Sequence, residues 1–310
     1  MSSIEWTDET WNPVVGCSRV SPGCEHCYAE GVAHRGLSKR HKGLTVLRSG
    51  GKGPRWTGEV RTVPEALDKP LRRRKPTTYF VNSMSDLFHP KVPREFVAAC
   101  FGVMAGAPQH TFQVLTKRPE EAREWFAWIK GQREDDVGRA GAWAWDRSGA
   151  SLHCRVEATR QAGWSIANGL RIQLSWPLPN VWIGVSVEDQ RRADDRIPVL
   201  LELPAAVRFL SVEPLLESVN LTPWLPSLDW VIVGGESGPG ARPCSVAWLR
   251  EVVDQCHAAD VPVFVKQLGA KPISRSEADF LATAGLDAKG GNWEAWPEDL
   301  RVREMPEPEP

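Results

Sequence analysis

Three cysteines near the N-terminus carry the clearest chemical signal in the sequence. Cys17, Cys24 and Cys27 lie within GCSRVSPGCEHCYAE, with six residues in the first gap and two in the second. Three thiolates this close together can bind three irons of a [4Fe–4S] cluster and leave the fourth iron open. Zinc is an alternative, because His26 or His34 can supply the fourth ligand of a structural zinc site. Three separate core cysteines, without any metal, are the remaining alternative.

An open iron is the feature that S-adenosylmethionine (SAM) requires, since its amino and carboxylate groups can chelate the metal there. Electron transfer from the reduced cluster then breaks the S–C5′ bond of SAM and yields a 5′-deoxyadenosyl radical, while the protein positions the reactants. Gly16 and Gly23 each precede a cysteine and permit loop conformations that other residues resist. Residues 25–34 can begin a helix, whose amide dipoles would face an anionic cluster.

Short apolar runs predict the strands that position this loop. Most are apolar throughout, which is typical of strands covered on both faces of a parallel sheet. Helical patterns at residues 93–105, 119–130 and 245–259 alternate with them, so we expect an α/β fold, a partial (β/α) barrel with parallel strands and outer helices. The predicted strands are residues 13–16, 78–82, 111–116, 181–187, 207–212, 230–234 and 261–266.

Polar side chains follow these strands at their carboxyl ends, the edge at which parallel α/β folds bind ligands. Ser186, Glu188, Glu213 and Glu236 are therefore candidate cofactor contacts. Glu188 and Glu213 are candidates for binding the SAM ribose or the substrate. The alternative for these two glutamates is an ion pair with a basic residue at a neighbouring strand end, Lys117, Arg118 or Lys266.

Further candidates follow the second main strand and the third cysteine. In radical SAM enzymes, whose cysteine loop this one resembles, the residues after the second strand contact the SAM amino group. The resemblance implies that role for Ser83, Ser85 and Asp86, and the alternative is a polar turn that caps the next helix. Tyr28 is a candidate for packing beside the cluster or the adenine ring, the alternative being an ordinary core aromatic. His89 is a lone histidine with a possible catalytic role.

The loop Gly234–Gly240 lacks the pattern of a phosphate-binding loop and predicts a tight strand exit. Arg242 follows it and can reach a carboxylate or a phosphate.

The cysteine loop resembles that of radical SAM enzymes, in which three cysteines follow the first strand of a partial (β/α) barrel. It differs in its first gap, which is usually three residues, and in His26, which replaces the usual aromatic residue. Gly234-Gly235-Glu236 resembles a radical SAM motif that contacts the SAM amino group, but it follows a late strand, so that role is not transferred.

Nearly the whole chain is also similar to a phage- and prophage-associated family of unknown function that has the same three cysteines. The matching pieces are IEWTDETWNP, GCSRVSPGCEHCYAE, FVNSMSDLFHP, QVLTKRP, VWIGVSVED, RFLSVEPLL, VIVGGESGPGARP and VFVKQLG. The resemblance implies a [4Fe–4S] cluster on Cys17, Cys24 and Cys27, with SAM as the second cofactor.

The chain of 310 residues predicts a barrel over residues 1–275 and a C-terminal extension over 276–310 that ends in a disordered Pro/Glu-rich tail. Residues 131–175 form an insertion. Residues 31–75 form a loop-like segment with 13 Lys or Arg and three acids, either a nucleic-acid contact or a solvated loop. Trp56 is the only aromatic residue in this segment, which argues against base stacking. No apolar run suggests a signal peptide or a membrane span, so we expect a cytoplasmic protein without membrane contact.

These features predict a radical SAM-like enzyme that abstracts hydrogen from an unidentified substrate, such as a nucleic acid or a modified nucleobase. Two alternatives stay open. One is a non-catalytic zinc- or iron–sulfur-binding module that contacts nucleic acid or a partner protein. The other is a cluster-containing DNA repair or photolyase-like protein. If the basic segment binds DNA, we expect Arg72, Arg73 and Arg74 to contribute to the salt dependence of binding.

Overall fold

A seven-stranded sheet is the framework of the protein in the computed structural model, which describes residues 4–36, 39–51, 53–131, 176–274, 287 and 289–307. The strand order is β1-β6-β7-β8-β9-β10-β12, and the pairs β1–β6, β6–β7, β9–β10 and β10–β12 are parallel. This confirms the predicted α/β class. The strands are β1 (Glu9–Trp11), β6 (Thr78–Val81), β7 (Thr111–Thr116), β8 (Val181–Ser186), β9 (Val207–Val212), β10 (Trp230–Gly234) and β12 (Val263–Gln267).

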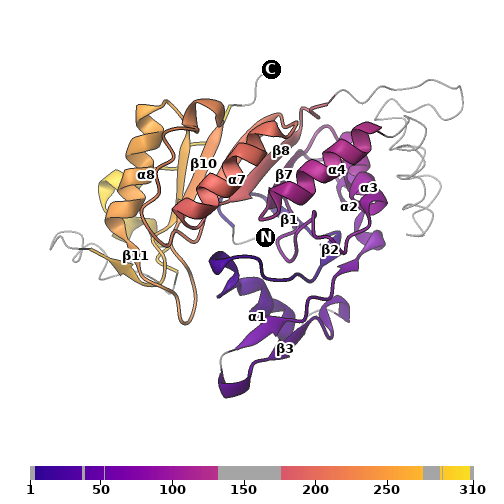
Figure 1. Cartoon of the computed structure of the whole chain (residues 1–310), viewed down its shortest axis with the longest axis horizontal. Coiled ribbons are helices and arrows are strands. Elements are labelled where there is room, and N and C mark those ends of the chain that lie inside the picture. Colours follow the sequence, from indigo (N-terminus) through magenta and orange to yellow (C-terminus); the bar gives the residue numbers. More distant parts are fainter. Residues whose placement is uncertain are drawn as a thin grey trace, which may run out of the picture. The chain divides into compact units, whose positions relative to one another are not determined.

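Four longer helices accompany the strands (Figure 1): α3 (Arg94–Ala105), α4 (Pro119–Gly131), α7 (Gln190–Glu202) and α8 (Val246–Ala258). Three of them confirm the predicted helices. The fourth, α7, is missing from the sequence prediction, because its first half is charged and Pro198 lies inside it. No described helix is long and apolar enough to cross a membrane.

The chain divides into two compact units. Unit 1 comprises Met1–Ser18, Ala29–Ile183 and Leu203–Ala206, and unit 2 comprises Arg19–Tyr28, Gly184–Glu202 and Val207–Pro310. These boundaries differ from the predicted division at residue 275. The predicted insertion at 131–175 lies, after Gly131, outside the described residues.

The core of unit 1 is rich in aromatic side chains. Phe101 of α3 stacks on Trp125 of α4 with ring centroids 4.7 Å apart and meets the edge of Phe126 at 5.7 Å. In the sheet, Tyr79 stacks on Phe112 at 5.5 Å. Aromatic pairs in these geometries add stabilisation beyond the area that they bury.

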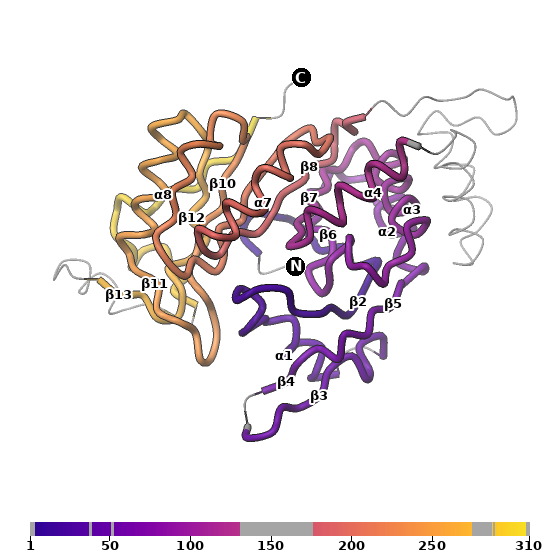
Figure 2. Tube along the Cα trace, in the orientation of Figure 1, coloured from indigo at the N-terminus to yellow at the C-terminus, as the bar shows by residue number. Residues whose placement is uncertain are grey.

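The basic segment of unit 1 is more ordered than the predicted loop. It contains a hairpin of β3 (Thr45–Leu47) and β4 (Pro54–Trp56), followed by β5 (Arg61–Thr62) and the short helix α2 (Lys69–Arg72), as Figure 2 shows. The strand predicted at residues 13–16 is only β2 (Val14–Val15), which pairs antiparallel with β5 outside the main sheet. The first strand of the main sheet is instead β1, whose single fully buried residue, Trp11, gave too weak a pattern.

Unit 2 packs α8 against β10 and β12 through an apolar stripe that includes Leu249, Val252 and Cys256. The first residues of the predicted C-terminal tail, up to Glu307, lie within the described part of the chain. Glu304 donates its backbone N–H to Val263 and accepts from the Trp230 indole, and the guanidinium of Arg303 lies 4.7 Å above the Trp293 ring.

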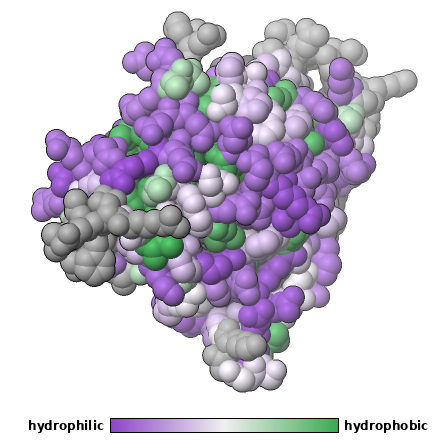
Figure 3. Space-filling view, turned by 60° about the vertical axis from the view of Figure 1, so that its left-hand side comes forward, coloured by the Kyte–Doolittle hydropathy of each residue, from purple (hydrophilic) through white to green (hydrophobic). Residues whose placement is uncertain are grey.

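The face drawn in Figure 3 is mostly hydrophilic, with small hydrophobic patches scattered over it. The large exposed hydrophobic residues of the described chain are few, and two of them, Val46 and Leu47, are neighbours on β3.

Candidate functional site

The three motif cysteines differ chemically from the other described cysteines. Cys17, Cys24 and Cys27 form no disulfide bond and are partly exposed. Cys100, Cys244 and Cys256 are free but buried, and burial raises the pKa of Cys244 and of Cys256 to about 12. A buried thiol with such a pKa stays protonated, whereas metal ligation needs an accessible thiolate. The donor set of the motif therefore fits a metal or a cluster.

The second half of the cysteine loop belongs to unit 2, and a buried glutamate anchors it. Gly23, in the turn that ends at Cys24, donates its backbone N–H to Glu188 Oε1 at 3.2 Å. Glu188 follows β8, has no exposed surface, and accepts a second bond at 2.9 Å from Arg196 on α7. A Cβ at position 23 would lie 3.0 Å from the Glu188 carboxyl carbon, which explains the glycine.

A second anchor holds the loop between Cys24 and Cys27. His26 Nδ1 donates to Glu236 Oε2 at 2.9 Å. The Arg242 guanidinium donates to both Glu236 oxygens, to Oε2 at 3.0 Å and to Oε1 at 2.5 Å. Burial alone would raise the pKa of Glu236, but the hydrogen bonds from Arg242 and His26 outweigh it and keep the pKa below its ordinary value. Arg242 was predicted to reach a carboxylate or a phosphate. In the structure it binds a carboxylate of its own chain, that of Glu236.

Both anchors lie where strands of unit 2 end. Glu188 follows β8 and Glu236 follows β10 after one residue, so the segment with Cys24 and Cys27 is fastened to the carboxyl edge of the sheet. That edge is the usual ligand-binding edge of parallel α/β folds.

The other strand-end residues of unit 2 bind their neighbours. Glu213 Oε1 is paired with Lys266 Nζ at 3.0 Å, which is the ion-pair alternative that the sequence left open. Ser186 is buried, and its carbonyl accepts from Arg196 at 2.7 Å. Tyr28 is 54% exposed, so it is not a core aromatic, and its packing beside a cluster or the adenine ring stays a prediction.

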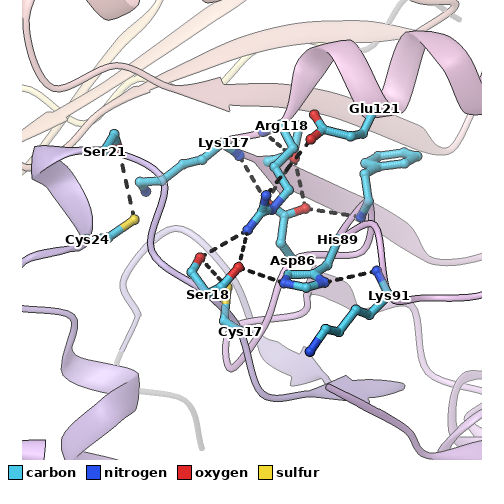
Figure 4. Close-up of polar contacts among 12 residues, drawn as sticks. Cys17, Ser18, Ser21, Cys24, Asp86, His89, Lys91, Lys117, Arg118 and Glu121 are labelled. Atoms are coloured by element: carbon cyan, nitrogen blue, oxygen red, sulfur yellow. Dashed lines mark hydrogen bonds and ion pairs between the residues drawn. The ribbon is translucent and has the colours of Figure 1, made fainter. Parts of the chain in front are cut away.

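Cys17 belongs to unit 1, where the next residue is clamped from two sides (Figure 4). His89 Nε2 lies 2.8 Å from Ser18 Oγ, and Arg118 Nη2 donates to the same oxygen at 2.8 Å and to the Ser18 carbonyl at 3.0 Å. The Lys91 backbone N–H donates to His89 Nδ1, so the neutral ring carries its hydrogen on Nε2 and donates it to Ser18. Burial, with the charge of Arg118, lowers the pKa of His89 to about 4.

The predicted SAM contacts of unit 1 also have partners within the chain. Asp86 accepts hydrogen bonds from Thr116 Oγ1 at 2.8 Å and from the Lys117 N–H at 3.1 Å. Ser85 Oγ donates to the Val14 carbonyl at 2.8 Å, and Ser83 Oγ donates to the Asn12 side chain at 3.2 Å. Asp86 therefore ties two strand ends together, and the two serines fix the segment that leads to Cys17. Their role toward SAM stays a prediction.

The structure brings some predicted residues together and leaves others apart. It groups Glu188 with Gly23, and Glu236 with His26 and Arg242, but Cys17 belongs to a different unit from Cys24 and Cys27. Within the described ranges, no three His, Cys, Asp or Glu side chains form a group that could hold a metal ion. Ligation by the three cysteines stays a prediction from the motif.

Sequence reasoning missed the clamp on Ser18 and the role of Arg196. His89 stood out only as a lone histidine, and its partner Ser18 is 71 positions away. Arg196 lies on the helix that the sequence did not predict. No spacing rule connects residues so far apart, so only the strand-end position of Glu188, Asp86 and Arg118 hinted at these contacts.

Comparison with known proteins gives one match. A family model described as "Protein of unknown function (DUF5131)" matches residues 1–297. No curated protein matches the chain, and no solved structure does.

Proposed function

Because the chain belongs to DUF5131, a family of unknown function, its chemistry has to be inferred from its residues, and we propose an iron–sulfur enzyme of the radical SAM type. In this proposal the seven-stranded sheet is the partial (β/α) barrel of such enzymes. The observation that carries it is the accessibility of the three motif thiols, two of which, those of Cys24 and Cys27, lie in a segment fastened to the ligand-binding edge of the sheet.

Cys17, Cys24 and Cys27 are the proposed cluster ligands. Three thiolates leave one iron of a [4Fe–4S] cluster open, and a cluster bound there would supply the one-electron chemistry that cleaves SAM. The other three described cysteines are unsuited to this role, because burial keeps them protonated.

The residues around the motif hold the loop in place. Glu188 fixes the turn before Cys24, Glu236 fixes His26, and His89 with Arg118 fixes Ser18 after Cys17. Side chains locked by such buried partners keep a site close to its working geometry. Glu188, Glu236 and Asp86 thus support the loop and the strand ends, and Tyr28 is the proposed side chain for stacking on the adenine of SAM.

The proposed substrate class is a nucleic acid or a modified nucleobase, because residues 31–75 are strongly basic in a chain whose net charge is only −1. The similarity to phage- and prophage-associated proteins stays a prediction.

SAM cleavage tests the activity. Protein reconstituted with iron and sulfide without oxygen should form 5′-deoxyadenosine from SAM when dithionite is added, as measured by mass spectrometry. The Cys17→Ala variant should lose this product, and Cys244→Ala, which removes a buried thiol outside the motif, should keep it. A protein that carries the full cluster and still leaves SAM intact would be a binding module and not an enzyme.

A further inference from the structure

The β3–β4 hairpin presents an exposed face that the proposed cluster chemistry does not use. Val46 and Arg55 are cross-strand partners, and both are exposed. Val46 is 54% exposed. Leu47 is 68% exposed, which is the largest exposed fraction among the large hydrophobic residues of the described chain. Val46 and Arg55 thus share one face of the ribbon, and Leu47, the next residue along β3, lies on the opposite face.

Buried contacts at its base hold the hairpin in a fixed conformation. Trp56, the last residue of β4, is 7% exposed and donates its backbone N–H to Glu30 Oε1 at 3.0 Å. Glu30 is buried on α1 (Tyr28–His34), and Thr57 closes the base with a backbone bond of 2.9 Å to Leu44. The exposed face is therefore carried by an anchored ribbon and not by a loose loop.

The cations of this region are largely unneutralised. In the described part of the chain, Lys42, Arg48 and Arg55 take part in no ion pair, and Arg40 pairs with Glu65 through exposed side chains at 3.3 Å. Two of the three arginines expected from the sequence are less available. Arg73 is paired with Glu9 at 2.6 Å, and Arg72 is paired with Asp68. The hairpin and the turns beside it thus carry cations that no acid of the described chain neutralises.

We propose that the β3–β4 hairpin docks into the major groove of double-stranded DNA. A two-stranded ribbon fits the major groove of B-form DNA, which is about 12 Å wide, whereas the major groove of A-form RNA is too narrow for it. Arg48 and Arg55 bind phosphates, and Val46, which lies beside Arg55 on one face of the ribbon, contacts a thymine methyl group.

Single-stranded nucleic acid fits this surface less well. Binding of single strands relies on aromatic side chains that stack on bases. Trp56 is the one aromatic residue of the segment, and it is buried at the base of the hairpin.

This inference deepens the proposed function, on which it rests for the nucleic-acid substrate class. DNA binding itself needs no cluster, so the docking proposal and the proposed SAM cleavage can be refuted independently of each other. The Cys17→Ala variant should bind duplex DNA like the wild type although it cleaves no SAM. A wild-type protein that cleaves SAM but does not bind DNA overturns the docking proposal alone.

Fluorescence anisotropy with a labelled duplex measures the docking. Replacing Arg48 and Arg55 by Gln in the full-length protein should weaken binding about tenfold and reduce the slope of log K against log salt concentration by about 2, because two phosphate contacts are lost. The control variant carries Lys271→Gln and Lys289→Gln, the same charge change on exposed lysines outside the segment, and should bind like the wild type.

Three results would overturn the proposal. The first is an unchanged affinity and salt slope in the hairpin variant, with circular dichroism showing that it is folded. The second is an equal loss in the lysine control. The third is tighter binding to single-stranded DNA, to double-stranded RNA or to anionic phosphatidylserine vesicles than to duplex DNA.

Discussion

Buried polar side chains next to the cysteine motif act as anchors for backbone. Glu188 accepts from Gly23 and Arg196, and it has no exposed surface. A charged group so deeply buried requires an opposite charge and full hydrogen bonding, and Arg196 supplies the charge. At this scale, two candidate cofactor residues of the sequence, Glu188 and Glu236, both hydrogen-bond the cysteine loop, and their contact with a cofactor stays a prediction.

His89, which binds Ser18 next to Cys17, should make the stability of the folded protein depend on pH. Burial lowers its pKa from 6.5 to about 4, so the unfolded chain binds a proton that the folded protein excludes. The neutral His89 therefore contributes fully to the free energy of unfolding above pH 6.5. This contribution, up to about 3 kcal/mol, is lost as the pH falls toward 4. Urea unfolding should therefore show a steeper loss of stability over this range in the wild type than in His89→Gln.

The difference between the two profiles isolates this histidine, because all other titrating groups are shared. Parallel profiles for wild type and variant would show that His89 titrates normally in the folded protein.

At the scale of elements, the loop after β2 depends on a close backbone approach. Gly16 has a φ of +89°, and a Cβ there would lie 2.3 Å from the Glu59 carbonyl oxygen. Gly58 has a similar φ of +82° with nothing within 4 Å of the same position. A side chain at either position would strain the backbone, but only a side chain at Gly16 would also clash with a neighbouring atom.

Gly58→Ala should cost about 1 kcal/mol, from the left-handed backbone alone. Gly16→Ala should cost at least about twice as much, because the clash with Glu59 adds to the strain. Thermal and urea unfolding of the two variants measure both costs. Equal losses of stability would contradict the close approach at Gly16.

The sequence predicts elements well where the apolar pattern is continuous. The ranges of β7, β9 and β10 coincide with the predicted runs, since each strand is buried along most of its length. It fails where burial is partial, as in β1, or where a proline interrupts a helix, as in α7. The basic segment read as a loop because its strands are only two or three residues long.

At the scale of the whole molecule, the sequence singles out the cysteine loop and the strand ends but not the contacts between them. The cysteine spacing identified the loop, and strand ends identified the sheet edge. The partners of the loop could not be predicted, because His26 and Glu236 are 210 positions apart in sequence. Such pairs are fixed by the order of strands in the sheet, which single-sequence patterns leave open.

The net charge of −1 likewise conceals a strongly basic segment. The proposed function depends on both features, the cysteine loop for the chemistry and the basic hairpin for the substrate. The cysteine loop comes first, since without a cluster no activity on DNA follows.

Iron, sulfide and zinc analysis of protein purified without oxygen tests this directly. We predict about four iron and four sulfide ions per chain, with an optical absorption that dithionite bleaches. Cys17→Ala, Cys24→Ala and Cys27→Ala should each lose iron, whereas Cys244→Ala should retain it. One zinc per chain, with no iron taken up on reconstitution, would contradict the account.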